Sequence, residues 1–444
     1  MKQRAFFIGF SLALAFPAIC PGQSTSPESN WPHWRGPNFT GTSETASPPV
    51  EWSEDENLRW KTPLPGLGHS SPVVFGDHVF VTTSIPIGEN FPPKPDLATG
   101  AHDNLLVSSK WQFAVLAFHR KTGEILWQTA VHEAVPKEGG HNTGTLASAS
   151  PTTDGIHVYA FFGSHGLYCL DVKTGKVRWS EDFGDMQTKH GHGEGCSPVL
   201  HGDRIFVNWD HEGLSFIGAL DKTTGKKIWR KPRNERTTWT SPIVIEHEGK
   251  PQLIAAGTER IRAYDPGDGE LIWECGGLSD NVVATPVYES GRLLATSSYD
   301  FQSMLAIDLV GASGDLTDSD HIKWTRRKRT PYIPSPLLVN GHVFYLAHYQ
   351  GVLSRVNLKT GDELTGPFRL GNLRDIYASP VAAKGRIYVV DRSGITLVLS
   401  DDPEPQPLAQ NQLNDRFSAT PALVGRALFL RGESFLYCLS NLEE

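Results

Sequence analysis

Cysteine is scarce in this 444-residue sequence, and none of its five cysteines is adjacent to another. The four beyond the N-terminal segment, Cys169, Cys196, Cys275 and Cys438, have spacings that match no zinc-binding pattern. Cys169 and Cys438 share the tetrapeptide Leu-Tyr-Cys-Leu, which indicates equivalent strand positions. We therefore expect buried, inert thiols, although the sequence leaves the disulfide state of all four open.

Long runs of like charge are missing too. Only 20% of the residues are charged, the formal net charge is −8, and the nearest approach to a basic run is Arg326 to Arg329. Four consecutive basic residues are typical of a solvated strand end, so we expect no nucleic-acid partner. No Ser-His-Asp order, phosphate-binding loop or carboxylate pair can be assigned from spacing, and we therefore assign no catalytic residue.

A hydrophobic run long enough to cross a membrane is also missing. Residues 5–19 form an apolar run after two basic residues, and this run is too short for a transmembrane segment. The pattern predicts a signal peptide over residues 1–22 and a periplasmic or secreted protein. Lipid anchoring at Cys20 is disfavoured because Ile19 stands where a small residue is expected. Association with the cell envelope by other means stays open.

What the sequence has instead is turns, with 43 glycines and 31 prolines. Residues 166–179 predict two strands joined by a tight turn, in which Gly175 takes the left-handed position and Trp179 ends an alternating strand. The same pattern recurs at three further places: Gly123 to Trp127, Gly225 to Trp229, and Gly269 to Trp273. Trp60 and Trp324 hold equivalent positions, and we expect all six tryptophans to pack between neighbouring units.

A second motif, a small hydroxyl residue followed by proline, precedes the first strand of every unit. It occurs at Ser71-Pro72, Ser150-Pro151, Ser197-Pro198, Ser241-Pro242, Thr285-Pro286, Ser335-Pro336, Ser379-Pro380 and Thr420-Pro421. A spacing near 44 residues, filled by four short strands, predicts a blade of a β-propeller. Eight openings predict an all-β, eight-bladed propeller over residues 50–444.

The chain ends predict how the ring closes. The last unit stops after residues 435–439 and lacks its Trp-bearing fourth strand, whereas residues 57–62 supply such a strand before the first unit. We expect these two segments to pair, which removes a free sheet edge. Residues 23–49 form an N-terminal tether with an aromatic strap, Trp31 to Pro37. We expect Trp31 and Trp34 to pin this strap to the outside of the folded body.

The loops at one end of the ring carry the candidate site. In a propeller, the loops that precede first strands and those that follow second strands share the face around the central funnel, and an insertion over residues 86–110 should overhang it. The candidate ligand-binding residues on these loops are His69, His141, Asn142, Trp209, His211, Trp239, Tyr332, Arg374, Tyr377 and Arg416.

The segment His190-Gly-His192-Gly-Glu194 is the most unusual of these loops. Alternate residues of an extended backbone share a side, so His190, His192 and Glu194 would form part of a divalent-metal site such as Zn²⁺, with His141 or His69 as a further ligand. A hydrogen-bonded polar rim and acid–base catalysis are the alternatives.

The repeated small-Pro strand, the Leu-Asp-x-x-Thr-Gly-x-x-x-Trp turn and the eightfold count resemble the pyrroloquinoline-quinone-like (PQQ-like) propeller repeat. The strap also looks like the opening of secreted bacterial propellers of that group. One branch contains quinoprotein alcohol dehydrogenases, which hold the quinone against a disulfide of adjacent cysteines, and this chain has no such pair. The other contains the propeller lipoprotein of the outer-membrane barrel-assembly machinery, a non-catalytic scaffold.

The resemblance implies a binding or scaffold module, with a protein or carbohydrate ligand at the funnel face and without bound PQQ. The alternative that stays open is an oxidoreductase or a metal-dependent enzyme that uses the histidine-rich funnel.

Overall fold

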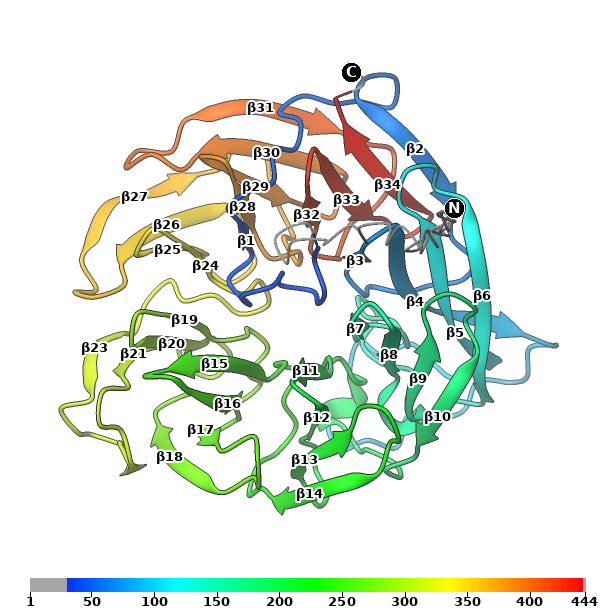
Figure 1. Ribbon diagram of the computed structural model, residues 1–444, viewed down its shortest axis with the longest axis horizontal. Helices are drawn as coiled ribbons and strands as arrows, with labels where there is room; N and C mark the ends of the chain where they lie inside the picture. Colours follow the sequence, from blue (N-terminus) through cyan, green and yellow to red (C-terminus); the bar gives the residue numbers. More distant parts are fainter. Residues whose placement is uncertain (1–29, 442–444) are drawn as a thin grey trace, which may run out of the picture.

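Eight antiparallel units follow one another around a ring in the computed structural model (Figure 1), which describes residues 30–441. The predicted all-β eight-bladed propeller is confirmed. In blades 1 to 4 the strands are β3 (Val73–Phe75), β4 (His78–Ile87), β5 (Lys110–His119), β6 (Ile125–Ala134); β7 (Thr152–Thr153), β8 (His157–Phe161), β9 (Leu167–Asp171), β10 (Val177–Glu181); β11 (Val199–His201), β12 (Arg204–Trp209), β13 (Phe216–Asp221), β14 (Lys227–Pro232); and β15 (Ile243–His247), β16 (Lys250–Ala256), β17 (Arg260–Tyr264), β18 (Leu271–Gly276).

Blades 5 to 8 repeat this plan. Their strands are β19 (Val287–Glu289), β20 (Arg292–Ser297), β21 (Ser303–Asp308), β23 (Ile322–Arg326); β24 (Leu337–Val339), β25 (His342–Leu346), β26 (Val352–Asn357), β27 (Glu363–Arg369); β28 (Val381–Ala383), β29 (Arg386–Val390), β30 (Ile395–Ser400), β31 (Pro407–Gln412); and β32 (Ala422–Val424), β33 (Ala427–Arg431), β34 (Phe435–Ser440), β2 (Leu58–Pro63). Two short parallel additions, β1 (Thr42–Ser43) on β28 and β22 (Gly314–Asp315) on β18, extend blades 7 and 4.

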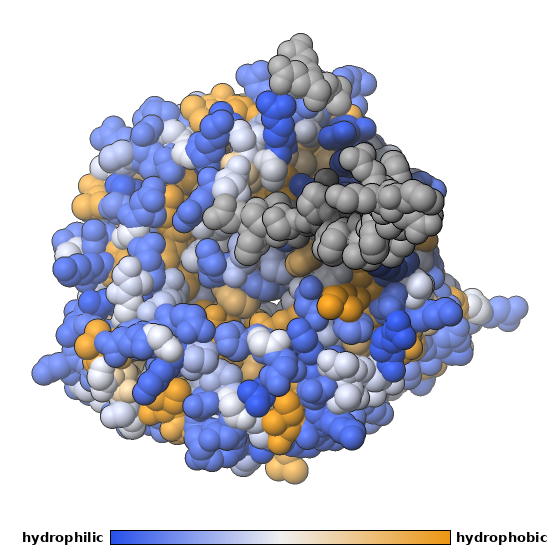
Figure 2. All heavy atoms as spheres, viewed as in Figure 1, coloured by the Kyte–Doolittle hydropathy of each residue, from blue (hydrophilic) through white to orange (hydrophobic). Residues whose placement is uncertain are grey.

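Helical structure is limited to short turns in residues 30–441, such as Gly163–His165 and Lys189–Gly191. In this part of the chain no helix has the length and apolar character that a membrane crossing requires. The predicted signal peptide over residues 1–22, including Cys20, and part of the tether lie outside the described residues. Hydrophilic residues dominate the face turned to the viewer in Figure 2, with apolar residues scattered among them.

The ring closes as the sequence predicted. Strand β2 pairs antiparallel with β34, with Trp60 opposite Cys438 and Pro63 opposite Phe435. This pairing gives blade 8 its fourth strand and joins the first part of the described chain to the last. A β-sheet edge that would otherwise be free is therefore covered.

The small hydroxyl residues before the strand-opening prolines form a nearly continuous hydrogen-bonded ring. The backbone N–H of Ser71 donates to Oγ of Ser150 at 2.8 Å, and the ring returns to its start where Thr420 N–H donates to Ser71 Oγ at 3.0 Å. The intermediate donor–acceptor pairs are Ser150–Ser197, Ser197–Ser241, Thr285–Ser335, Ser335–Ser379 and Ser379–Thr420. Because buried N–H groups need acceptors, a side-chain oxygen recurs at this position.

The Trp-bearing strands fasten each blade to the next. The indole Nε1 of Trp179 donates to the carbonyl of Lys222 at 3.0 Å in the following blade, and its ring lies against Gly225. Four further pairs repeat this bond: Trp60–Arg120, Trp127–Val172, Trp229–Pro266 and Trp324–Leu358. The predicted position between blades is confirmed for these five tryptophans. Trp273 instead donates to Gln252 of its own blade at 3.0 Å.

The aromatic strap runs across the inner strands of the ring, and Trp31 fastens it to the first strand of blade 1. This residue is fully buried, and its N–H donates to Val74 O of β3 at 2.7 Å. The equally buried Arg35 donates to the carbonyls of Pro336 and Pro380 at 2.5 and 2.9 Å. The channel between the inner strands offers backbone acceptors and apolar walls, which attract the strap inwards. Figure 1 shows β1, just after the strap, near the centre of the ring.

Candidate functional site

A cavity of about 490 Å³ lies at the end of the ring where the loops preceding the first strands meet those following the second strands. All eight blades contribute to its wall. Its ionisable and aromatic lining residues are His69, His102, His141, His192, Glu194, Trp239, Tyr299, Tyr332, His348, Tyr349 and Tyr377. We call this cavity the funnel. None of these ring-bearing side chains belongs to the two repeated contacts between blades, the Trp hydrogen bonds and the hydroxyl ring.

The structure brings together part of the predicted ligand set. Five of the ten predicted ligand-binding residues line the funnel: His69, His141, Trp239, Tyr332 and Tyr377. The other five do not line it: Asn142, Trp209, His211, Arg374 and Arg416. Trp209 belongs to the core between blades 2 and 3, where it stacks on Phe216 with ring centroids 5.7 Å apart. It ends strand β12 with its side chain directed between the blades, so it contributes to packing and not to the site.

One wall of the funnel is a continuous row of aromatic rings from blades 5 to 7. Tyr332 stacks on His348 with centroids 4.9 Å apart, and its ring lies 6.0 Å from that of Tyr299. The row continues from His348 to Tyr349 at 4.6 Å and from Tyr349 to Tyr377 at 5.9 Å. The sequence analysis missed Tyr299, His348 and Tyr349, which follow the second strands of blades 5 and 6. The sequence already predicted that the loops following second strands lie on the funnel face. Examining this loop in every blade would therefore have identified these three residues.

Opposite this row lies a cluster of four histidines, of which His102, His141 and His192 line the funnel and His190 does not. The ring centroids of His102 lie 4.9 Å from His190 and 4.8 Å from His192, and His141 lies 4.8 Å from His192. His102 belongs to residues 88–109, the loop between β4 and β5, which we call the overhanging loop. The prediction that this insertion reaches over the funnel is confirmed.

Hydrogen bonds fasten the overhanging loop to the loops that precede blades 2 and 3. Asn142 N–H, before blade 2, donates to Asp103 O at 2.7 Å. Asn104 Nδ2 donates to the carbonyl oxygen of His190, before blade 3, at 2.6 Å. The overhanging loop is therefore a fixed part of the funnel wall, although Asn104 and His190 are 86 positions apart in the sequence.

The predicted metal-ligand geometry of His190, His192 and Glu194 is not found. Lys189–Gly191 forms a 3₁₀ turn in which His190 has a φ of 59°, so the backbone is not extended and alternate residues do not share a side. Both Glu194 carboxylate oxygens instead accept hydrogen bonds from Ser164, one of them from the backbone N–H at 2.7 Å. Within residues 30–441, no group of three or more His, Cys, Asp or Glu side chains is arranged to hold a metal ion.

Burial favours the uncharged forms of the ionisable groups in the funnel. Desolvation, aided by nearby Arg431, lowers the pKa of His69 to about 3. Desolvation also lowers the pKa of His192 to about 4, and the neighbouring imidazoles act in the same direction. For Glu194, desolvation raises the pKa to about 7 against the hydrogen bonds from Ser164. The funnel wall is therefore polar without carrying a strong charge.

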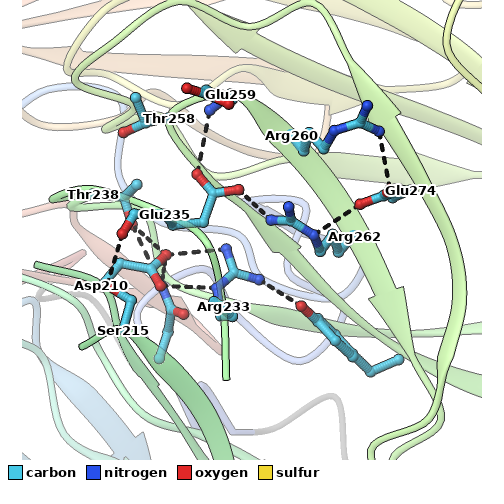
Figure 3. A network of polar contacts seen from close by, with 12 residues as sticks. Asp210, Ser215, Arg233, Glu235, Thr238, Thr258, Glu259, Arg260, Arg262 and Glu274 are labelled. Atoms are coloured by element: carbon cyan, nitrogen blue, oxygen red, sulfur yellow. Dashed lines mark hydrogen bonds and ion pairs between the residues drawn. The ribbon is translucent and has the colours of Figure 1, made fainter. Parts of the chain in front are cut away.

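A buried ion-pair network anchors the segment that leads to Trp239 (Figure 3). Arg233 Nε donates to Asp210 Oδ1 at 2.8 Å, and both side chains are fully buried. Two residues further along the chain, Glu235 pairs with Arg262 of β17. Because breaking a buried pair leaves an uncompensated charge, this segment is held firmly in place. The indole of Trp239 also donates to Gly193 O at 2.7 Å, which fixes the ring at the funnel wall.

The residues of the funnel do not fit a PQQ cofactor. PQQ carries carboxylates, whose recognition favours arginine or lysine, and within the described residues neither type lines the funnel. The four described cysteines are free, buried and in no disulfide. Burial raises the pKa of Cys196 and of Cys438 to about 12, as expected of inert thiols.

A family model described as "Outer membrane protein assembly factor BamB" matches the chain over residues 49–208, 112–363 and 213–441. Outer membrane protein assembly factor BamB of Yersinia pestis is 21% identical over 316 residues, which cover 70% of this chain and 64% of that protein. Polyvinylalcohol dehydrogenase of Sphingopyxis sp. (strain 113P3) is 22% identical over 282 residues, covering 53% of this chain and 37% of the dehydrogenase. The chain thus spans less than two thirds of either curated relative.

Two solved structures share the propeller. BamB from Moraxella catarrhalis aligns with a TM-score of 0.51 at 16% identity, covering 82% of this chain and 99% of that chain. A europium-containing methanol dehydrogenase aligns with a TM-score of 0.62 at 12% identity, covering 93% of this chain and 91% of that chain. At these identities the likeness concerns the fold alone.

Proposed function

Because this chain belongs to the PQQ-like propeller family described by outer membrane protein assembly factor BamB, we propose that it is a binding or scaffold module that acts through its funnel. The observation that carries the proposal is the funnel wall itself. Every blade supplies lining residues, and about half of these residues carry rings that lie outside the repeated contacts between blades. Sites of this kind, concave and rich in aromatic groups with a few polar ones, are typical of ligand binding.

Catalysis finds less support in the geometry. Glu194, the carboxyl group of the funnel wall, is bound to Ser164, and no metal-ligand group is arranged in the described part of the chain. The dehydrogenase relatives show that the fold supports oxidoreductases, but fold does not determine function. The geometry of the described residues therefore favours binding over the oxidoreductase alternative.

The place of action that we propose is the periplasm or the cell exterior, with envelope association. The apolar N-terminal run and the family support this proposal. Proteins of the envelope and carbohydrates are the two ligand classes that an aromatic funnel suits.

Site-specific photocrosslinking tests the proposal. A photoreactive phenylalanine analogue at Tyr299, which lines the funnel and is 42% exposed, should give covalent adducts when the chain is produced in a bacterial envelope. The same analogue at Ile156, which is 67% exposed in the β7–β8 turn away from the funnel, is the control and should give none. Adducts of equal yield at both positions, or none at Tyr299, would overturn the proposal.

A further inference from the structure

We propose that the ligand of the funnel is a neutral carbohydrate. Its sugar rings stack on the row of aromatic rings that runs from Tyr299 to Tyr377, which we call the tyrosine wall, and its hydroxyls bond to the facing imidazoles. This inference rests on the proposed function, because it names the ligand class of the same site.

The tyrosine wall offers a succession of aromatic rings for contact with a ligand. Tyr299, Tyr332, His348, Tyr349 and Tyr377 form one row in which each ring centroid lies 4.6–6.0 Å from the next. The C–H groups on one side of a sugar ring are apolar and slightly positive, whereas the face of an aromatic ring is negative. A row of rings therefore suits successive sugar units along a chain.

The facing wall offers neutral hydrogen-bonding groups. A neutral imidazole has one N–H donor and one acceptor nitrogen, and a sugar hydroxyl can pair with both kinds of group. His69, His141 and His192 line the funnel, and burial lowers the pKa of each. Ser418 also lines it, and its buried Oγ has no hydrogen-bond partner in the structure. An unpaired buried hydroxyl costs free energy, which a ligand hydroxyl would recover.

The charges around the funnel argue against ionic ligands. Within the described residues neither Asp, Lys nor Arg lines the cavity. Two nearby cations are paired with carboxylates: Lys189 Nζ lies 2.8 Å from Asp280 Oδ2, and Arg416 Nε lies 3.6 Å from Glu433 Oε1. Arg431, near His69, donates to the carbonyl oxygen of Thr82 at 2.6 Å, and the carboxyl group of Glu194 in the lining accepts hydrogen bonds from Ser164. Phosphate and carboxylate ligands favour arginine or lysine, and basic peptides favour acidic groups. The funnel therefore selects a neutral ligand.

The size and the apolar content of the funnel favour a sugar over a peptide. Its volume of about 490 Å³ lies in the range of small-ligand sites, which suits a short oligosaccharide. The larger aliphatic side chains in the lining of the funnel are those of Val283 and Ile333. Grooves that bind amphipathic helices use broad hydrophobic surfaces for apolar anchoring side chains, whereas this wall consists mainly of rings with polar tips.

Calorimetric titration of the full chain with neutral hexasaccharides tests the inference. The ligands are maltohexaose, cellohexaose, laminarihexaose and N-acetylchitohexaose, with hexagalacturonic acid and an uncharged tyrosine-containing hexapeptide for comparison. At least one neutral sugar should bind, and Tyr332→Ala and Tyr349→Ala should weaken that binding at least tenfold. Ile156→Ala, away from the funnel, should bind like the unchanged chain, and Tyr349→Phe, which keeps the ring, should retain more of the binding than Tyr349→Ala.

Three results would overturn the inference: no binding of any neutral hexasaccharide, equal binding by the alanine variants, or tighter binding of the acidic sugar or the peptide. The photocrosslinking result separates this failure from that of the proposed function. Protein adducts at Tyr299 without sugar binding would leave the funnel a binding site and remove the carbohydrate alone. No adducts at Tyr299 would remove the proposed function itself.

Discussion

Gly225 shows at the residue scale how one position carries two constraints. Its φ of +72° lies in the left-handed region, and an added Cβ would lie 2.7 Å from the ring of Trp179. The glycine is therefore needed both for the turn and for the approach of the indole from the preceding blade. Gly202 has a similar φ of +59°, but an added Cβ there would meet nothing within 4 Å.

Gly225→Ala and Gly202→Ala separate these two constraints. Gly202→Ala should lower the free energy of unfolding by about 1 kcal/mol, because only the backbone conformation is disfavoured. Gly225→Ala should lower it by about 2–4 kcal/mol, since overpacking adds to the same conformational cost. Urea unfolding followed by circular dichroism measures both. Equal losses in the two variants would show that the Trp179 contact does not constrain this turn.

Strand β2 shows at the element scale how the ring is held shut. Its pairing with β34 covers an edge, and Trp60 joins it to blade 1 through a hydrogen bond to Arg120 O at 3.0 Å. An uncovered edge is a template for pairing with other chains. The strand therefore contributes to solubility as well as to stability.

Deletion of residues 50–62 should expose the edge of β34 and lead to aggregation, which light scattering during expression and purification measures. The control is replacement of residues 90–108, within the overhanging loop, by a short glycine-containing turn. This control keeps the β4–β5 hairpin and should stay soluble. A soluble β2 deletion with an unchanged melting temperature would contradict the closure argument.

Buried histidines make the stability of the whole molecule depend on pH. Desolvation lowers the pKa of His33, in the strap, and of His69, at the funnel, to about 3. Their ordinary value in an unfolded chain is about 6.5, so the unfolded state takes up protons first as the pH falls. Their contribution to stability is therefore complete above about pH 6.5 and is lost as the pH falls toward 3. The contribution of Glu194 to stability depends on pH in the opposite direction, because the pKa of its carboxyl group is raised to about 7. This contribution is complete below about pH 4.3 and is lost as the pH rises to 7.

The free energy of unfolding should consequently fall between about pH 6.5 and 4.5, since the histidines outnumber the carboxyl. His69→Gln should make this fall shallower by about 1–2 kcal/mol, because the variant has no imidazole to protonate in the unfolded state. His102→Gln, at an exposed position, is the matched control. Urea unfolding at a series of pH values measures the slopes, and identical slopes for the His69 variant and the unchanged chain would contradict the prediction.

The sequence by itself determined the repeat, and with it most of the architecture. The Ser/Thr-Pro openings and the Gly-to-Trp turns act within one blade or between neighbours, so their spacing predicts eight blades and the closure by β2. Local patterns predict such features because strand alternation and turn chemistry depend on nearby residues. The same reasoning placed His69, His141, Trp239, Tyr332 and Tyr377 on the funnel wall.

Tertiary structure decided what depends on segments far apart in the chain. The path of the strap followed from carbonyls of the segments that open blades 6 and 7, which Arg35 binds across 301 and 345 positions of sequence. The histidine cluster arose because the overhanging loop brings His102 to His190 and His192. The conformation of His190 itself, left-handed in a tight turn, removed the alternation on which the metal prediction depended. Contacts of this kind have no local signature, because their free energy comes from the closed ring and not from the segment.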